Sequence, residues 1–442
     1  MEVQLKPTIL VVFGITGDLS QRYLLPALSQ ICADGHLSRN FKVLGLSRRQ
    51  VSLNDVLAER FKALKPHSSM LRLNPNQLSD YHLLKETVEK IDDDEFGGQA
   101  QIIFYLVVPP QAILTIIKNL GAAGLNYRRV KLLLEKPFGT DLSSATKLIE
   151  ETAKYFPEEQ VYRIDHYLAK ESAQNVAVFL GSNALFRNVW SNQFIDRIDV
   201  SAAEAIGIEG RKELWESTGT LRDFVQSHLL QLAALTLMEP CSHKFDFAEL
   251  PHRRLAALRK IKAADPKKAI RGQYDGYRQE VGMPNSVSET FASLELSSSD
   301  KRWQGTSIKV ATGKKLDQKL TKIDIHFKKT QEAEANVLTL RLHPREGIEL
   351  DLWVKEPGYE HRLQKQPLRF IYEQRFGRVP EAYEQVLIDA MRSKQSLFAS
   401  SGEVLESWRI LEPVQKKWAK ESKDLRFYKQ GSTIEQVLDK NT

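Results

Sequence analysis

The first stretch whose residue types indicate chemistry is LLLEKPFGTDL (132–142), in which a lysine closely follows an apolar run. The run predicts a buried strand, and parallel sheets bind ligands at the carboxyl ends of their strands. Lys136 therefore lies where a cation can contact an anionic ligand. A solvated lysine in an ordinary loop is the alternative explanation.

A second stretch, YRIDHYLAKE (162–171), gathers Asp165, His166, Tyr167 and Lys170 within six residues. If a helix begins at His166, then His166 and Lys170 lie four residues apart on one face. A cation and a hydrogen-bond donor in that arrangement suit a phosphate. A histidine that only stabilises the fold is the alternative.

The third stretch, GTLRDFVQSHLLQL (219–232), has apolar residues at helical spacing, and His228 falls beside this apolar stripe. A buried polar side chain destabilises the fold unless it has a partner. His228 is therefore either a catalytic group or a core histidine held by hydrogen bonds. Asp223 and Gln226 border the same region and could reach sugar hydroxyls, although ordinary surface positions explain them as well.

A glycine-containing turn lies near the start of the chain, in VVFGITGDLSQRYLLP (11–26). Gly14 and Gly17 can adopt backbone angles closed to other residues and leave no side chain in the way of a phosphate. A following helix would direct its free N–H groups and its positive dipole end to the same place. The turn predicts a nucleotide site, although G-x-x-G-D differs from the usual dinucleotide pattern and an ordinary strand-to-helix turn also fits.

The end of the second strand bears on which nucleotide binds. Sites for NAD tend to have an acidic residue there, whereas sites for NADP have an arginine that binds the 2′-phosphate. The strand ends LGLSRRQ, with Arg48 and Arg49 and no carboxylate. This favours NADP over NAD, with a solvated arginine pair as the alternative.

Strand-like and helix-like segments alternate in the first part of the chain, which predicts a parallel sheet. The expected strands are nearly continuous in hydrophobicity, as strands buried on both faces are. They lie at 8–14, 41–47, 101–108 and 130–135, with a helix at 111–124. We expect a Rossmann-like, doubly wound α/β domain over residues 1–167.

After about residue 180 the expected strands alternate apolar with polar residues, which is typical of antiparallel strands with one solvated face. They lie at 290–296, 306–312, 322–328, 337–343 and 348–354, with helices at 380–393 and 402–414. We expect a larger α+β domain with a mostly antiparallel sheet over residues 168–442, and the exposed faces of such sheets often become oligomer contacts.

The composition is that of a globular enzyme. The 442 residues are 42% hydrophobic and 27% charged, and this length favours two domains. The only cysteines, Cys32 and Cys241, are too few for a disulfide framework or a zinc cluster. With no signal-peptide pattern and no run of about eighteen apolar residues, we expect a cytoplasmic protein without a membrane span.

The net charge of +7 is spread along the chain and not gathered in basic tracts. A positive field attracts anionic metabolites and nucleic acids alike. Nucleic-acid sites usually combine clustered arginines with aromatic residues, and no such cluster is present. We therefore expect an anionic small molecule as the partner, and no nucleic acid.

Six ordered motifs resemble the glucose-6-phosphate dehydrogenase family over residues 8–432. They are FGITGDL, EKPFGTDL, RIDHYLAKE, TGTLRDFVQSHLLQ, RWQGTSIKVATGKKL and PEAYEQVLIDAMRSKQSLFASSGEVLESWRI. The resemblance implies oxidation of glucose 6-phosphate to 6-phosphoglucono-1,5-lactone with NADP, the first step of the oxidative pentose phosphate pathway. It further implies a homodimer or homotetramer that needs no metal.

The resemblance also implies roles for individual residues. Those matching the coenzyme site are Gly14, Ile15, Thr16, Gly17, Asp18, Leu19, Arg48, Tyr105 and Lys136. Those matching the sugar-phosphate site are Lys136, His166, Tyr167, Lys170, Glu204, Asp223, Lys314 and Lys319. His228 matches the general base and Asp165 the carboxylate that orients it, and the Lys136–Pro137 bond is expected to be cis.

These roles are chemically consistent with one another. Oxidation of a hemiacetal carbon requires hydride to leave for a nicotinamide while a base removes the hydroxyl proton. The intrinsic pKa of histidine suits this base, and a carboxylate on its other ring nitrogen fixes the tautomer. The phosphate, remote from the reacting carbon, supplies binding energy that positions it.

The chain departs from the family pattern at several positions near the expected site. Tyr23 stands where the family has a lysine, Ser227 precedes His228 in place of an asparagine, and His343 stands where a glutamine is frequent. Loss of the lysine charge is expected to weaken capture of a dianionic phosphate. There are two alternative functions: a dehydrogenase of another sugar or amino-sugar phosphate, and an inactive NADPH-binding protein.

Overall fold

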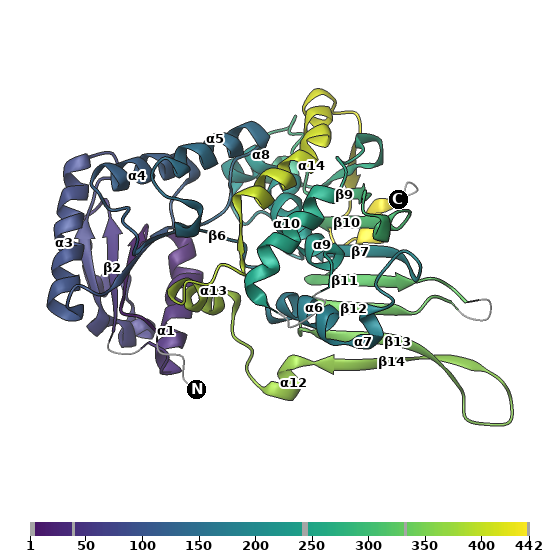
Figure 1. Cartoon of the computed structure of the whole chain (residues 1–442). Helices are drawn as coiled ribbons and strands as arrows, with labels where there is room; N and C mark the ends of the chain where they lie inside the picture. The colour runs from purple at the N-terminus through teal and green to yellow at the C-terminus, as the bar shows by residue number, and fades with distance from the viewer. Residues whose placement is uncertain (1–4, 38–39, 241–245, 331–333, 440–442) are drawn as a thin grey trace. The chain divides into compact units, whose positions relative to one another are not determined.

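The computed structural model describes residues 5–37, 40–240, 246–330 and 334–439, so Cys241 lies outside the described residues (Figure 1). The chain divides into two compact units. The first unit comprises Met1–Gly139, Ser143–Ala169 and Pro380–Ser401, and the second comprises Thr140–Leu142, Lys170–Val379 and Gly402–Thr442. Every helix in the described part of the chain is too short or too polar to cross a lipid bilayer.

The sheet of the first unit has seven strands in the order β15-β6-β5-β4-β1-β2-β3. Its strands are β1 (Thr8–Phe13), β2 (Phe41–Ser47), β3 (Ser68–Arg72), β4 (Gln101–Leu106), β5 (Val130–Leu134), β6 (Val161–Ile164) and β15 (Phe398–Ala399). All pairings among β1 to β6 are parallel, which confirms the doubly wound α/β fold. The order places β1 beside β4, the reversal point at which such sheets bind nucleotides.

Helices cover both faces of this sheet because successive residues of β1 point to opposite faces. Leu10 and Val12 pack in one core cluster with residues of α1 and α13, whereas the ring of Phe13 stacks on Tyr81 of α3. The main helices of the unit are α1 (Leu25–Ala33), α3 (Leu78–Phe96), α4 (Pro110–Ala122), α5 (Leu142–Ala153) and α13 (Ala382–Met391). Short helical turns are η1 (Ser20–Leu24), α2 (Leu53–Val56), η2 (Glu59–His67) and η3 (Glu158–Gln160).

Residues 380–401 return from late in the chain to complete the first unit, although the sequence alone grouped them with the second domain. Strand β15 pairs antiparallel with β6, and the apolar side of α13 joins the core beneath α1. The carbonyl of Ala390, at the end of α13, accepts a 2.5 Å hydrogen bond from Lys131 Nζ. Burial lowers the pKa of Lys131 to about 7.

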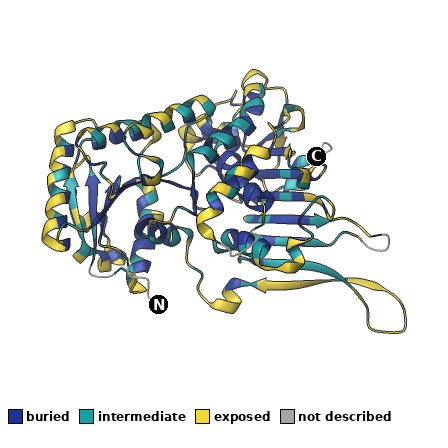
Figure 2. Ribbon diagram, in the orientation of Figure 1, coloured by how far each residue is buried: buried dark blue, intermediate teal, exposed yellow. Residues whose placement is uncertain are grey.

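The second unit contains a nine-stranded sheet in the order β14-β13-β12-β11-β7-β10-β9-β8-β16. Most neighbours are antiparallel, as expected, but β7–β10 and β8–β16 are parallel. The strands are β7 (Ile195–Ala203), β8 (Ile270–Tyr274), β9 (Phe291–Leu296), β10 (Ser307–Gly313), β11 (Leu320–Phe327), β12 (Val337–His343), β13 (Gly347–Lys355), β14 (Leu363–Ile371) and β16 (Leu425–Tyr428). Figure 2 shows that the central strands are largely buried and that β14, at the edge, is mostly exposed.

Helices of the second unit pack against this sheet and against one another. They are α6 (Glu171–Ser182), α7 (Ala184–Arg187), α8 (Lys212–Thr220), η4 (Leu221–Leu229), α9 (Leu230–Leu237), α10 (Leu250–Lys260), α11 (Tyr277–Val281), α12 (Tyr372–Phe376), α14 (Ser401–Lys420) and α15 (Ile434–Leu438). A fully buried ion pair, Arg254 Nε to Glu403 Oε1 at 2.7 Å, joins α10 to α14.

A fragment test follows from the role of residues 380–401. Each buried apolar side chain contributes about 1.5–3 kcal/mol, whereas the net stability of a domain is only about 5–15 kcal/mol. We expect residues 1–169 alone to lack a cooperative thermal transition by circular dichroism, and a fusion to residues 380–401 through a flexible linker to regain it. The same fusion carrying Val386→Asp and Phe398→Asp is the control. A cooperative transition in the unfused fragment would contradict this account.

Candidate active site

The glycine turn after β1 depends on Gly14. Its φ is +83°, and a Cβ there would lie 2.1 Å from the carbonyl oxygen of Val107, so no other residue fits. Gly17 does not adopt a left-handed conformation, contrary to the expectation for both glycines. Its N–H donates to the Gly14 carbonyl at 2.9 Å, and the tightness of this turn leaves little room for a side chain.

The helical segment after the turn begins with a π-helix, η1, before α1 continues it. The hydroxyl of Ser20 donates to the Gly14 carbonyl at 3.0 Å and fixes the turn to the helix start. Of the predicted coenzyme residues here, Ile15 is buried in the core, whereas Thr16 and Asp18 are exposed and Leu19 is half-buried. A ligand above the turn would therefore meet backbone and short polar side chains.

Arg48 follows β2 at the same edge of the sheet, since Phe13 of β1 pairs in register with Leu46 of β2. Both Arg48 and Arg49 are exposed. A small hollow of about 30 Å³ lies beside them and is lined in part by Arg49 and by Arg72, the last residue of β3. Arg72 was not identified from the sequence as a candidate site residue, because the strand SSMLR is too polar to be recognised from its apolar periodicity.

Tyr105 and Glu135 form a hydrogen-bonded side-chain pair in the first unit. Tyr105 is fully buried in β4, and its hydroxyl donates to Glu135 Oε1 at 2.5 Å. Glu135 follows β5 and precedes Lys136, whose bond to Pro137 is cis as expected. Burial raises the pKa of Glu135 to about 7, while hydrogen bonds and the charge of Lys136 oppose that rise.

The turn after β6 carries Asp165, His166 and Tyr167, and the expected helix from His166 is wrong. Residues 166–169 form turns, and α6 begins at Glu171 with Lys170 as its N-cap. The carboxylate of Asp165 accepts the N–H of Tyr167 at 3.0 Å, a short-range bond that competes with helix formation. His166 and Lys170 therefore do not share a helical face, and Lys170 belongs to the second unit.

In the second unit, Lys170 and Lys319 surround His343. Lys170 Nζ lies 3.4 Å from the carbonyl oxygen of Leu342 and 3.6 Å from Glu346 Oε1. Burial, followed by the charges of Lys319 and Lys170, lowers the pKa of His343 to about 4. The imidazole of His343 is therefore neutral near pH 7, and Lys170 beside it is paired with Glu346.

Glu204 and Lys314 form an ion pair between two parallel strand ends. Ala203 of β7 pairs in register with Gly313 of β10, so the next residue of each strand lies at the same edge. Lys314 Nζ lies 2.5 Å from Glu204 Oε2 and 4.6 Å from the ring centre of Trp215. The structure thus brings together two predicted sugar-binding residues and fixes the lysine, which is 3% exposed.

Asp223 and His228 lie on η4, which is a π-helix and not the α-helix that apolar spacing predicted. In a π-helix backbone hydrogen bonds run from i to i+5, the separation of Asp223 and His228, and the turn is wider than in an α-helix. His228 is 1% exposed, its ring meets that of Phe224 edge-on at 5.0 Å, and η4 packs against β7, β9 and β10.

A buried carboxylate fixes the start of this π-helix. Glu289 Oε1 accepts the N–H of Leu221 at 3.0 Å, and the Glu289 carbonyl accepts that of Thr220 at 3.0 Å. Burial raises the pKa of Glu289, and the bond from Leu221 opposes the rise. Gly219 makes this contact possible, since it has φ of +65° and a Cβ there would lie 2.4 Å from Glu289 Oε1.

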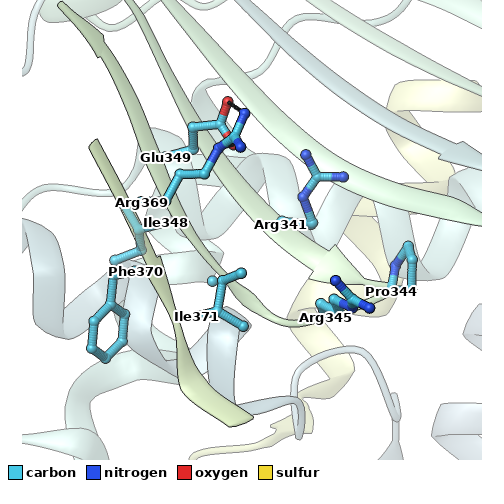
Figure 3. Close-up of a pocket in the computed structure, with 9 residues that line it drawn as sticks. Arg341, Pro344, Arg345, Ile348, Glu349, Arg369, Phe370 and Ile371 are labelled. Atoms are coloured by element: carbon cyan, nitrogen blue, oxygen red, sulfur yellow. Dashed lines mark hydrogen bonds and ion pairs between the residues drawn. The ribbon is translucent and has the colours of Figure 1, made fainter. Parts of the chain in front are cut away.

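A hollow of about 620 Å³ lies elsewhere, on the sheet of the second unit (Figure 3). It is lined by Arg341, Arg345 and Arg369 together with apolar residues of β13 and β14. Arg369 is paired with Glu349 at 2.8 Å. None of the predicted site residues lines this hollow. Among the described residues, no group of three or more His, Cys, Asp or Glu side chains could hold a metal ion.

Two family models match consecutive parts of the chain. "Glucose-6-phosphate dehydrogenase, NAD binding domain" matches residues 11–175, and "Glucose-6-phosphate dehydrogenase, C-terminal domain" matches residues 177–440. The glucose-6-phosphate 1-dehydrogenase of Chlamydia muridarum is 35% identical over 98% of this chain and 94% of its own length. That of Rhizobium meliloti is 32% identical over 97% of this chain and 95% of its own length.

Solved structures agree with these sequence matches. A glucose-6-phosphate dehydrogenase in complex with its substrate glucose-6-phosphate has a TM-score of 0.91 and 28% identity, covering 98% of this chain and 96% of that chain. The glucose-6-phosphate 1-dehydrogenase from Mycobacterium avium has a TM-score of 0.84 and 28% identity, covering 97% and 95%.

The contact between Gly219 and Glu289 can be tested by Gly219→Ala. The backbone of Gly219, with φ of +65° and ψ of 176°, lies in a region that is essentially restricted to glycine and costs an alanine about 1–3 kcal/mol, and the new methyl group displaces the Glu289 carboxylate from Leu221. We expect a lower melting temperature and a several-fold lower kcat. Gly210→Ala is the matched control, because Gly210 has φ of +76° and open space where the methyl group would be added. Equal effects of the two substitutions on kcat would contradict the positioning role of Glu289.

Proposed function

We infer that this chain, which belongs to the glucose-6-phosphate dehydrogenase family, oxidises D-glucose 6-phosphate at C1 to 6-phosphoglucono-1,5-lactone and transfers hydride to NADP. The observation that carries this proposal is the arrangement around η4. This helix holds Asp223 and His228 and packs on β7 and β10, after which Glu204 and Lys314 follow. A base and hydrogen-bonding groups for a sugar thus occur within one compact unit.

In the proposed reaction, His228 removes the proton of the C1 hydroxyl as hydride leaves C1. NADP, when bound, accepts that hydride. An imidazole is suited to this step because its intrinsic pKa lies near neutral pH. Asp165 is proposed to orient His228 and to stabilise the imidazolium, as the carboxylate does in a Ser-His-Asp triad.

The remaining residues are proposed to hold the two ends of the sugar phosphate. Glu204, Asp223 and Lys314 hydrogen-bond the sugar hydroxyls. His166, Tyr167, Lys170 and Lys319 bind the phosphate, with Lys136 near the sugar. Binding energy at the phosphate then positions C1 for hydride transfer.

The coenzyme is proposed to bind through residues 1–167 and the sugar through residues 168–442, with residues 380–401 completing the coenzyme-binding unit. The backbone of the Gly14 turn fits a pyrophosphate, and Arg48 fits the 2′-phosphate that distinguishes NADP from NAD. Tyr105 supports Glu135 and, through it, the loop of Lys136. We propose a cytoplasmic homodimer or homotetramer.

Another sugar phosphate is a second candidate substrate. Tyr23 and His343 alter the surroundings of the proposed phosphate and sugar subsites, and the imidazole of His343 is neutral near pH 7. Absorbance of reduced coenzyme with a panel of hexose and amino-sugar phosphates would separate the two. A strong preference for a sugar phosphate other than glucose 6-phosphate would overturn the first assignment.

His228→Ala is expected to lower kcat by roughly 100-fold to 10,000-fold, because the general base is lost. The affinity for NADP, measured by fluorescence titration, is expected to stay nearly unchanged. His252→Ala, on the distant helix α10, is the control for histidine removal. Loss of NADP binding or of the folded state in His228→Ala would instead make His228 a structural residue.

Arg48→Ala is expected to weaken NADP by about 10-fold or more while changing NAD only slightly, because only NADP carries the 2′-phosphate. Arg49→Ala is the matched control, since both arginines are exposed at the same strand end. The measurement is kcat/KM with each coenzyme. Equal losses with NADP and NAD would remove Arg48 from the phosphate site.

A further inference from the structure

Tyr383 contacts three segments that follow separate strands of the first unit. Its ring lies nearly parallel to that of Tyr23, with centres 5.4 Å apart and an angle of 20°. It also lies nearly parallel to the imidazole of His166, with centres 6.2 Å apart and an angle of 18°. Tyr23 comes from η1 and His166 from the turn after β6, so Tyr383 contacts both through one aromatic ring.

The third segment is that of Glu135, which accepts the hydroxyl of Tyr105 at 2.5 Å. Burial raises the pKa of Tyr383, and the neighbouring Glu135 charge raises it further, so the phenol stays protonated. The ring of Tyr383 is held by helix α13 and by its packing against the core cluster of the first unit.

Tyr23 is the outermost ring of this stack. Its residue is 52% exposed, and it is not among the buried residues of the core cluster, whereas Tyr383 packs against that cluster. Removal of the Tyr23 side chain should therefore leave the core intact. It would expose one face of Tyr383 to solvent and remove a stacking partner, an interaction that is favourable in near-parallel, offset geometry.

His166 needs such support because it lies in a turn and not in a helix or strand. Its neighbours are turn residues, and the bond from the Tyr167 N–H to Asp165 fixes the backbone. The ring of Tyr167 lies 4.8 Å from that of His166, but it is tilted by 54° and does not stack on it. A phosphate ligand must present its N–H in a fixed direction, since hydrogen bonds weaken steeply as the angle departs from linear. Stacking on Tyr383 restricts the plane of the imidazole and so restricts that direction.

We propose that Tyr23 is a positioning residue for the phosphate-binding imidazole of His166 and acts through the ring of Tyr383. The proposal rests on the proposed function, in which His166 binds the sugar phosphate. Tyr23 supplies no positive charge. It fixes the orientation of a group that binds phosphate, and so it acts on the affinity for phosphate and not on hydride transfer.

The variants Tyr23→Ala and Tyr383→Leu each remove one part of the stack. With glucose 6-phosphate, each is expected to raise KM by about 2- to 10-fold, the range expected for loss of one aromatic contact. The inhibition constant of inorganic phosphate is expected to rise by the same factor. In Tyr23→Ala, the kcat and the dissociation constant of NADP are expected to stay within about twofold, because Tyr23 acts on the phosphate subsite alone.

Four further variants separate positioning from simple packing. Tyr23→Phe and Tyr383→Phe keep the stacked rings and are expected to restore KM to within about twofold of the wild type. Tyr127→Ala is the matched control, a partly buried tyrosine of the same unit that is outside the stack. The double variant Tyr23→Ala/Tyr383→Leu is expected to raise KM by less than the product of the two single effects, since both act through one path.

The outcomes distinguish this inference from the proposed function. Absence of turnover by the wild type with glucose 6-phosphate would contradict the proposed function. The role of Tyr23 would then be tested separately, by calorimetric measurement of the affinity for inorganic phosphate. Unchanged phosphate affinity in Tyr23→Ala would overturn the positioning role. A KM change in the double variant equal to the product of the two single changes would also overturn it. So would a KM change in Tyr127→Ala as large as that in Tyr23→Ala. A parallel loss of NADP affinity would make the stack a structural element of the unit.

Discussion

The placement of parallel strand ends is the constraint on which the rest of this protein depends. In the first unit, Gly14, Arg48, Lys136 and Asp165 each follow closely on a parallel strand, and the register brings those ends to one edge of the sheet. The second unit repeats the arrangement on a smaller scale in a mostly antiparallel sheet, where the parallel pair β7–β10 sets Glu204 against Lys314. Parallel strands place their carboxyl ends together, so polar side chains there converge without long loops to carry them.

The π-helix η4 is a local departure from regular structure that the surrounding packing maintains. The buried carboxylate of Glu289 accepts the first N–H group of η4, that of Leu221. Because Gly219 has no side chain, this carboxylate can approach the backbone closely. The widened turn changes which residues share a face of η4, the helix that carries both Asp223 and His228. Irregular helices of this kind occur frequently at functional sites, because packing must stabilise a geometry that the backbone alone disfavours.

Charge and aromatic stacking contribute differently to the two units. The second unit provides cations directly, with Lys170 and Lys319 beside a neutral His343. In the first unit the ring of Tyr383 stacks with both Tyr23 and His166, and the carboxyl group of Glu135 accepts the hydroxyl of Tyr105. Tyr23 is therefore part of a defined aromatic arrangement and not an isolated surface residue.

Much of the protein was determined by local sequence pattern. The continuous apolar runs around Val12 and Leu133 predicted parallel strands, the alternation in IDIHF predicted an antiparallel one, and the residues flanking these strands identified the candidate site. The tertiary structure alone decided three features: the return of residues 380–401 to the first unit, the π-helix that carries Asp223 and His228, and the non-helical turn at His166. Each depends on partners far along the chain or on competing hydrogen bonds, such as Lys131 with Ala390 and Glu289 with Leu221. Hydrophobic periodicity reports which side of a segment is buried, but it contains no information about which distant segment buries it or which carboxylate binds its first N–H group.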